Sequence, residues 1–295
     1  MINLAVINDY LILCKPKVVL LMLVTAWVGM YLASPLFISW HVVVYGTLGI
    51  SLAASSAAVI NHLMDRHIDL KMTRTSNRPI ASGRINTKQA ITFAVILAII
   101  AWLILSKLIN MLTAILTFAT LFGYAVIYTL YLKRATPQNI VIGGLSGAMP
   151  PLLGWAAVSN NINPHSLLLV LIIFTWTPPH FWALAIYRVN DYANAKIPML
   201  PVTHGIKFTK LCLLLYTILL FAVTCLPFAV HMSGVTYLVA ASILNIIFLS
   251  LALRLYKADG TIERLLAIKT FNFSLIYLLL LFMALLIDQR MEFYL

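Results

Sequence analysis

Long apolar segments recur along almost the whole of this chain. Between residues 18 and 287, runs of about 18 or more predominantly apolar residues alternate with short polar stretches. A helix of that length crosses the roughly 30 Å hydrocarbon core of a bilayer. Apolar residues make up 62% of the chain and charged residues 9%, whereas soluble proteins are about one quarter charged. The sequence therefore predicts an all-α polytopic membrane protein.

Nine membrane spans are predicted, arranged around a central cavity. They occupy residues 18–36, 42–60, 89–107, 111–131, 139–158, 166–186, 210–230, 235–255 and 266–287. We expect residues 1–295 to form a single membrane domain, without a soluble domain or a cleaved signal segment. The three cysteines, Cys14, Cys212 and Cys225, are too scattered for a disulfide framework or a metal site.

The cations are divided unevenly between the two sets of loops. If the N-terminus lies inside, every lysine and arginine except Lys107 and Arg290 falls on the inner side. Cytoplasmic loops carry such an excess of basic residues. We therefore expect the N-terminus in the cytoplasm and the C-terminus on the opposite side of a bacterial inner membrane. The net charge of +12 has the same origin, so the expected partner is the lipid bilayer and not nucleic acid.

A row of oxygen-bearing side chains follows the second predicted span. Asn61, Asp65 and Asp69 are spaced i, i+4, i+8, so they share one face of a helix that continues from that span. Carboxylate and amide oxygens suit Mg²⁺, which usually keeps waters and substrate phosphates in its shell. Ordinary interfacial ion pairs are the alternative interpretation. Carboxylates at a membrane are costly unless paired or metal-bound, so the row predicts a Mg²⁺ site.

Cations and a second polar segment surround this row in the predicted topology. Residues 187–205 follow the sixth span and bring Tyr187, Asp191 and Lys196 to the same membrane face. Positive side chains beside a Mg²⁺ site indicate a diphosphate ligand, whose charge both would neutralise. The predicted diphosphate-binding residues are Arg66, Lys71, Arg74, Arg78, Lys133, Arg134 and Tyr187, with Lys15 and Lys196 as further candidates.

A diphosphate bound inside a membrane implies an apolar tail, and an isoprenyl diphosphate fits that description. Loss of its diphosphate produces an allylic cation, which needs an apolar, aromatic-lined cavity that excludes water. The pairs Pro150–Pro151 and Pro178–Pro179 interrupt helical hydrogen bonding and are expected to shape this cavity. No phosphate-binding GxxxxGK[ST] loop is present, which argues against a nucleotide site of that type.

Several motifs resemble the UbiA-type intramembrane prenyltransferases, and within them the branch that farnesylates haem. These motifs are NHLMDRHID at 61–69, MTRTSNRP at 72–79, GAMPPLLGW at 147–155, WTPPHFWALAI at 176–186 and IPMLP at 197–201. The resemblance implies Mg²⁺-dependent transfer of a farnesyl group from farnesyl diphosphate to a vinyl group of haem B. It implies haem O as the product and a reaction at the cytoplasmic side.

The resemblance also assigns roles to individual residues. Asn61, Asp65 and Asp69 would bind the metal, and Asp65, Asp69 and Asp191 would act on the diphosphate. Many family members carry a second aspartate where this chain has Ala195, which leaves a second metal site open. Lys196 is the candidate to bind diphosphate directly in its place. His180, in the TPPH segment, is a candidate haem contact beside a structural alternative. Association with a downstream haem-modifying enzyme or with terminal oxidase assembly is a further expectation.

Two alternative functions keep some of these features. A quinone or aromatic-ring prenyltransferase of the same family would share the Asn-Asp-Asp row but has no evident need for WTPPHFWALAI. A non-enzymatic haem or lipid transporter would tolerate loss of Asp65 and would show no Mg²⁺ dependence.

Overall fold

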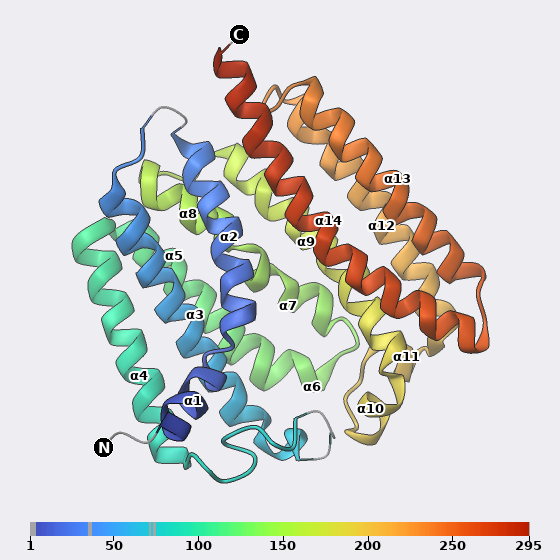
Figure 1. Ribbon diagram of the computed structural model, residues 1–295. Helices are drawn as coiled ribbons and strands as arrows, with labels where there is room; N and C mark the ends of the chain where they lie inside the picture. Colours follow the sequence, from blue (N-terminus) through green and yellow to red (C-terminus); the bar gives the residue numbers. More distant parts are fainter. Residues whose placement is uncertain (1–3, 35–36, 71, 73–74, 295) are drawn as a thin grey trace. The chain divides into compact units, whose positions relative to one another are not determined.

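The computed structural model describes residues 4–34, 37–70, 72 and 75–294, and every regular element within them is a helix (Figure 1). Nine of the described helical segments are long and apolar enough to cross a membrane. They are Pro16–Ala33, Trp40–Asp69, Thr87–Ile109, Met111–Leu132, Asn139–Ser159, Pro164–Tyr187, Gly205–Ala229, Val235–Lys257 and Gly260–Gln289. The predicted fold class is thereby confirmed, while the sidedness of the two termini stays a prediction.

The second span departs most from its predicted bounds. Its apolar part ends near residue 60, but helix α3 runs from Trp40 to Asp69 without a break. No glycine or proline interrupts residues 61–69, so the polar residues continue the helix that the apolar residues began. The Asn-Asp-Asp row is therefore helical, as its spacing predicts.

The described chain divides into two compact units, and each has its own packing. The first comprises residues up to Lys133 together with Met149–Asn161. Its helices are α1 (Leu4–Leu13), α2 (Pro16–Ala33), α3, α4 (Thr87–Ile104), η1 (Leu105–Ile109), α5 (Met111–Phe122), η2 (Gly123–Leu132) and α8 (Pro150–Ser159), and Lys133 begins the short α6 (Lys133–Ala135). Within this unit α3 packs against α4, α5 and η2, and α2 packs against α8. The predicted single-domain organisation stays a prediction.

The second unit comprises Arg134–Ala148 and the residues from Ile162 onward. Its helices are α7 (Asn139–Ala148), α9 (Pro164–Tyr187), α10 (Val189–Asn194), α11 (Leu200–Thr203), α12 (Gly205–Ala229), α13 (Val235–Lys257) and α14 (Gly260–Tyr294). Helices α12, α13 and α14 lie side by side, and α9 packs against α12 and α14 (Figure 1).

Two glycines allow α2 and α8 to approach each other closely. A Cβ atom at Gly29 would overlap the backbone carbonyl of Pro151, and one at Gly154 would overlap the carbonyl of Ala26. Small residues at such crossings let helix backbones touch inside a membrane, where burial of apolar area offers little driving force. The contact therefore joins α8 to the C-terminal half of α2, which spans Pro16–Ala33.

The two proline pairs behave differently. Pro150 and Pro151 begin α8 directly after α7 ends, which matches the expected helix break. The prediction of a helix break at Pro178 and Pro179 is wrong, because α9 continues through both residues. A proline removes one helical hydrogen bond without necessarily ending a membrane helix, because neighbouring side chains and helices support the freed carbonyl groups.

The polar loop after α3 leads into α4, whose first turn is fixed by a capping box. Asn86 accepts a hydrogen bond from the Gln89 backbone N–H, and the Gln89 side chain accepts one from the Asn86 N–H. This reciprocal capping box fixes the first turn of α4. Arg84 also pairs with Asp9 of α1, with Nε 3.0 Å from Oδ2. The loop is therefore tied to α1 by the ion pair and to α4 by the capping box.

Candidate active site

A row of three buried side chains lies near the C-terminal end of α3. Asn61, Asp65 and Asp69 have exposed fractions of 4%, 2% and 4%. Their i, i+4, i+8 spacing places them on one face, and Asn61 Nδ2 donates a hydrogen bond to Asp65 Oδ2 at 3.0 Å. Buried carboxylates need opposite charges or a bound cation nearby. The groups that surround the row therefore decide its chemistry.

Asp65 is held by a lysine that directly follows η2. Lys133 Nζ lies 2.6 Å from Asp65 Oδ2. Thr129, also from η2, places its Oγ1 3.4 Å from Asn61 Nδ2 and donates to the Tyr124 carbonyl. The π-helical geometry of η2 is a rare form that recurs at functional sites. It brings Thr129 and Lys133 onto the same face toward α3.

Asp69 is paired with an arginine of the following loop. Arg78 Nη1 donates to both carboxylate oxygens of Asp69, at 2.9 and 3.0 Å. Thr75 Oγ1 donates to the Asp69 backbone carbonyl at 3.0 Å, which turns the loop back over the end of α3. The row thus has one positive partner for each carboxylate.

A third cation reaches the row from the entrance to α2. Lys15 has a left-handed backbone with φ of 50°, and its Nζ donates to Asn61 Oδ1 at 2.5 Å. Burial, together with the positive charges of Arg78 and Lys133, lowers the pKa of Lys15 to about 8 against the opposing effect of the two aspartates. The sequence alone makes Lys15 only a further candidate for diphosphate binding, because Lys15 and Asn61 are 46 positions apart in the chain.

The row has the chemistry that Mg²⁺ requires. Asp65 Oδ1 is buried and accepts no hydrogen bond from the described residues. No three histidine, cysteine, aspartate or glutamate side chains converge anywhere in the described part of the chain, so the protein would supply few ligands. Mg²⁺ is commonly bound in this way, by one or two carboxylates with waters and substrate phosphates. The donor set therefore fits this metal.

His62 is a further buried polar residue in this part of α3, and the i, i+4, i+8 spacing of the row does not include it. His62 is 2% exposed, and neither ring nitrogen has a hydrogen-bond partner among the described residues. A buried polar group without a partner is uncommon in folded proteins and requires an explanation. In the sequence, only the position of His62 next to Asn61 indicates that it lies near the row.

Other predicted cations lie elsewhere or outside the described residues. Arg66 Nη1 donates to Thr87 Oγ1 at 2.9 Å, and its Nε donates to His67 Nε2. The hydrogen bonds of Arg66 therefore lead to α4 and not to the row. Lys71 and Arg74 lie outside the described residues, as does the side chain of Arg134. Their diphosphate-binding roles stay predictions.

The second polar segment belongs to the second compact unit. Asp191 lies on α10 and pairs with Arg188, whose Nη1 is 3.3 Å from Asp191 Oδ2. Lys196 is exposed and has a left-handed backbone with φ of 54°. The Arg264 guanidinium lies 5.0 Å from the centre of the Tyr187 ring, a cation–π contact. The predicted roles of Asp191, Lys196 and Tyr187 stay predictions.

His180 occupies a defined position within α9. Its ring stacks on Trp176 and Phe271, with centroids 4.3 and 4.7 Å away. Ser274 Oγ donates to the Phe271 carbonyl at 2.6 Å and lies 2.6 Å from His180 Nδ1. His180 Nδ1 therefore shares a hydrogen bond with Ser274 Oγ, which orients the imidazole ring. The predicted haem contact at His180 stays a prediction.

These features define a polytopic, all-helical membrane protein with a buried acidic row that lysine and arginine side chains neutralise. The sequence profile of the UbiA prenyltransferase family matches residues 22–276, so the chain belongs to this family. The family resemblance seen in the motifs is thereby confirmed.

Individual relatives are similar over nearly their whole lengths. "Protoheme IX farnesyltransferase" of Legionella pneumophila (strain Corby) is 60% identical over 282 residues, covering 96% of this chain and 95% of the relative. "Protoheme IX farnesyltransferase 2" of Pseudoalteromonas atlantica is 57% identical over 286 residues, covering 97% and 93%.

Solved structures share the fold at low sequence identity. A digeranylgeranylglyceryl phosphate synthase gives a TM-score of 0.80 at 20% identity, covering 96% of this chain and 98% of that chain. A UbiA homologue from Archaeoglobus fulgidus, bound to DMAPP and Mg²⁺, gives 0.66 at 15% identity, covering 94% and 99%. At such identities the likeness concerns the fold alone.

Proposed function

We propose that this protein transfers a farnesyl group from farnesyl diphosphate to a vinyl group of haem B, with haem O and diphosphate as products. The main observation behind this proposal is the 60% identity, over 96% of the chain, to a relative named protoheme IX farnesyltransferase. The buried acidic row supports the proposal independently, because a prenyl diphosphate needs a charged site at the edge of an apolar protein.

Asp65 and Asp69, with Asn61 beside them, are the residues that would hold Mg²⁺. The unpartnered Asp65 Oδ1 supports this assignment, and so does the presence of Mg²⁺ in the Archaeoglobus homologue. When bound, the metal supplies positive charge that neutralises the diphosphate and polarises its bond to the prenyl carbon.

The cations around the row are proposed to bind and stabilise the leaving diphosphate. Lys15, Arg78 and Lys133 each place a positive group on the row. Positive charge fixed before reaction stabilises the negative charge that grows on a departing phosphate. Lys71, Arg74, Arg134, Tyr187, Asp191 and Lys196 are proposed to complete this site.

The bond changes follow from the substrates. The bond between C1 of the farnesyl group and the diphosphate oxygen breaks, and the diphosphate leaves with the electron pair. The vinyl π electrons then form a new carbon–carbon bond to farnesyl C1. Water adds to the cation beside the porphyrin ring and releases a proton, which gives the hydroxyethylfarnesyl group. Exclusion of other water from the cavity protects the allylic cation.

The haem is proposed to contact His180, whose ring is oriented by the hydrogen bond between Nδ1 and Ser274 Oγ. We also propose that the reaction occurs at the cytoplasmic face of the inner membrane. Delivery of the apolar product to a haem-modifying enzyme or an oxidase is consistent with that location.

Purified protein in detergent, incubated with farnesyl diphosphate, haem B and Mg²⁺, tests the function directly. The expected result is a porphyrin whose mass rises by one farnesyl group and one hydroxyl group, together with released diphosphate. Chelation of divalent cations should stop the reaction, and added Mg²⁺ should restore it. Prenylation of hydroxybenzoate, with haem B left unmodified, would instead support the quinone or aromatic-ring prenyltransferase alternative.

A further inference from the structure

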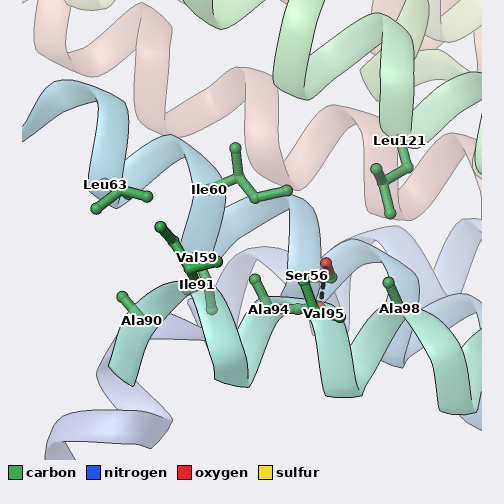
Figure 2. Close-up of a pocket in the computed structure, with 10 residues that line it drawn as sticks. All are labelled: Ser56, Val59, Ile60, Leu63, Ala90, Ile91, Ala94, Val95, Ala98 and Leu121. Carbon is green, nitrogen blue, oxygen red and sulfur yellow. Dashed lines mark hydrogen bonds between the residues drawn. The ribbon is translucent and has the colours of Figure 1, made fainter. Parts of the chain in front are cut away.

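An apolar groove lies between α3 and α4 in the first compact unit (Figure 2). It has a volume of about 180 Å³, and Leu121 of α5 also lines it. Helix α3 contributes Ser56, Val59, Ile60 and Leu63 to the lining, and Ile91 and Ala98 are among the lining residues from α4. The Ser56 hydroxyl, the polar side chain among them, already donates to the Ala94 carbonyl at 2.9 Å. The groove therefore offers an apolar surface.

The groove lies on a different side of α3 from the acidic row. Ser56, Ile60 and Leu63 are spaced i, i+4, i+7, and this stripe is about half a turn from the stripe of Asn61 and Asp65. A prenyl tail whose diphosphate binds at the row would extend from that other face. The groove therefore requires a different occupant.

One end of the groove carries a positive charge. Val59, Leu63 and Arg66 are spaced i, i+4, i+7 along α3, so Arg66 continues the line of groove residues. Thr87 and Ile91 stand one turn apart on α4, and Arg66 Nη1 donates to Thr87 Oγ1 at 2.9 Å. The hydrogen bond therefore spans the two helices at the groove end.

That charge is not neutralised by a carboxylate of the described chain. Asp9, Asp65 and Asp69 are paired with Arg84, Lys133 and Arg78 respectively. Among the described residues, Arg66 donates to Thr87 and His67, and neither partner is a carboxylate. Lys88, in the first turn of α4, is exposed nearby in sequence. The end of the groove is therefore complementary to an anion.

We propose that this groove binds one acyl chain of an anionic phospholipid, whose phosphate is held by Arg66 with support from Lys88. The lipid occupies the inner leaflet, since basic residues mark this end of α3 as cytoplasmic in the predicted topology. Anionic lipids are enriched in that leaflet and are attracted by basic residues next to membrane helices. The lipid would fill the cleft between α3 and α4 and so support the helix that carries the acidic row.

Native mass spectrometry of the full-length protein, titrated with phosphatidylglycerol and with phosphatidylcholine, tests this proposal. We expect one phosphatidylglycerol to bind saturably and at least fivefold more tightly than phosphatidylcholine. Arg66→Gln should weaken phosphatidylglycerol binding about fivefold and reduce the preference for phosphatidylglycerol over phosphatidylcholine. Arg254→Gln, an exposed basic residue at the end of α13, is the matched charge control and should have no effect.

A second pair of variants tests the groove itself. Ala98→Phe fills the groove and should abolish saturable binding of both lipids, while Ile96→Phe, exposed and outside the groove, should not. If Ala98→Phe fails to fold, the smaller Ala98→Leu should still weaken binding. Equal binding of the two lipids, or unchanged binding in Ala98→Phe, would overturn the proposal. A dimer that excludes lipid would overturn it in favour of a second copy of the chain.

Discussion

The two oxygens of Asp65 have different surroundings, and this difference determines what the residue can bind. Oδ2 accepts from Asn61 and Lys133, whereas Oδ1 is buried and has no hydrogen-bond partner among the described residues. Asp65 therefore retains an acceptor for a cation or a substrate group.

Replacement of either carboxylate of the row should remove activity without removing the fold. We expect Asp65→Asn and Asp69→Asn each to lower kcat/KM by on the order of 100-fold or more, as the loss of a metal ligand would. Measured farnesyl transfer to haem B gives the result.

Asp288→Asn is the matched control, because Asp288 is equally buried but caps the start of α13 by accepting from the Gly234 and Tyr237 N–H groups. It should lower Tm and leave kcat/KM of the folded protein close to that of the parent. Wild-type turnover in Asp65→Asn would contradict the metal-binding role.

The pairing of Asp65 with Lys133 should appear as energetic coupling. Lys133→Met alone leaves a buried carboxylate without its cation, and Asp65→Asn alone leaves a buried lysine without its anion. Each should lower stability by about 3 kcal/mol. The double variant should recover about 1 to 3 kcal/mol relative to the sum of the single effects, as measured from unfolding in detergent. Strictly additive effects would show that the two side chains do not interact in the folded protein.

At the scale of helices, the contact between α2 and α8 depends on the absence of two side chains. Gly29 and Gly154 each face a backbone carbonyl of the other helix, and a carbonyl cannot move aside as a flexible side chain can. The contact lies in the C-terminal half of α2, whereas Lys15 at the other end of the helix bonds to Asn61.

Enlargement of these glycines should therefore separate the two helices. Gly29→Val and Gly154→Val are each expected to destabilise the protein by about 1 to 3 kcal/mol or more, the usual cost of forcing extra atoms into a packed site. Gly147→Ala is the control, because nothing lies within 4 Å of a Cβ at that position. Thermal unfolding in detergent measures the difference. An equal Tm for all three variants would show that the close contact is not required.

At the scale of the whole molecule, the loops of the chain differ strongly in charge. All but two of the 20 lysines and arginines fall on one side in the predicted topology, and such asymmetry sets orientation during insertion. The acidic row stands at the same side, so the side on which the reaction occurs follows from the orientation.

Cysteine labelling can test that orientation. In a variant without Cys14, Cys212 and Cys225, we expect Asn77→Cys to be protected from a membrane-impermeant maleimide in intact spheroplasts. Asn161→Cys, in the loop between α8 and α9, should react. Both positions are exposed, so accessibility reports sidedness and not burial. The reversed pattern would place the acidic row on the outer side.

Much of the site follows from the sequence, since the Asn-Asp-Asp row is defined by local helical spacing. The cations that pair with the row do not follow from local spacing. Lys133 lies 68 positions from Asp65 and Lys15 lies 46 positions from Asn61, and no periodicity relates positions so far apart. Arg66 shows the opposite case, because adjacency to Asp65 suggested a shared role while its hydrogen bonds lead to Thr87.

The amino-acid sequence alone predicts the nine membrane spans, the helical row of oxygen ligands and the family, because each depends on local composition or on short motifs. The folded structure was needed to show which cation neutralises which carboxylate, which carboxylate oxygen has no partner among the described residues, and which glycines face another backbone. Hydrophobic length and helical period act within one segment, whereas charge pairing and close packing depend on side chains that the fold brings together from distant segments.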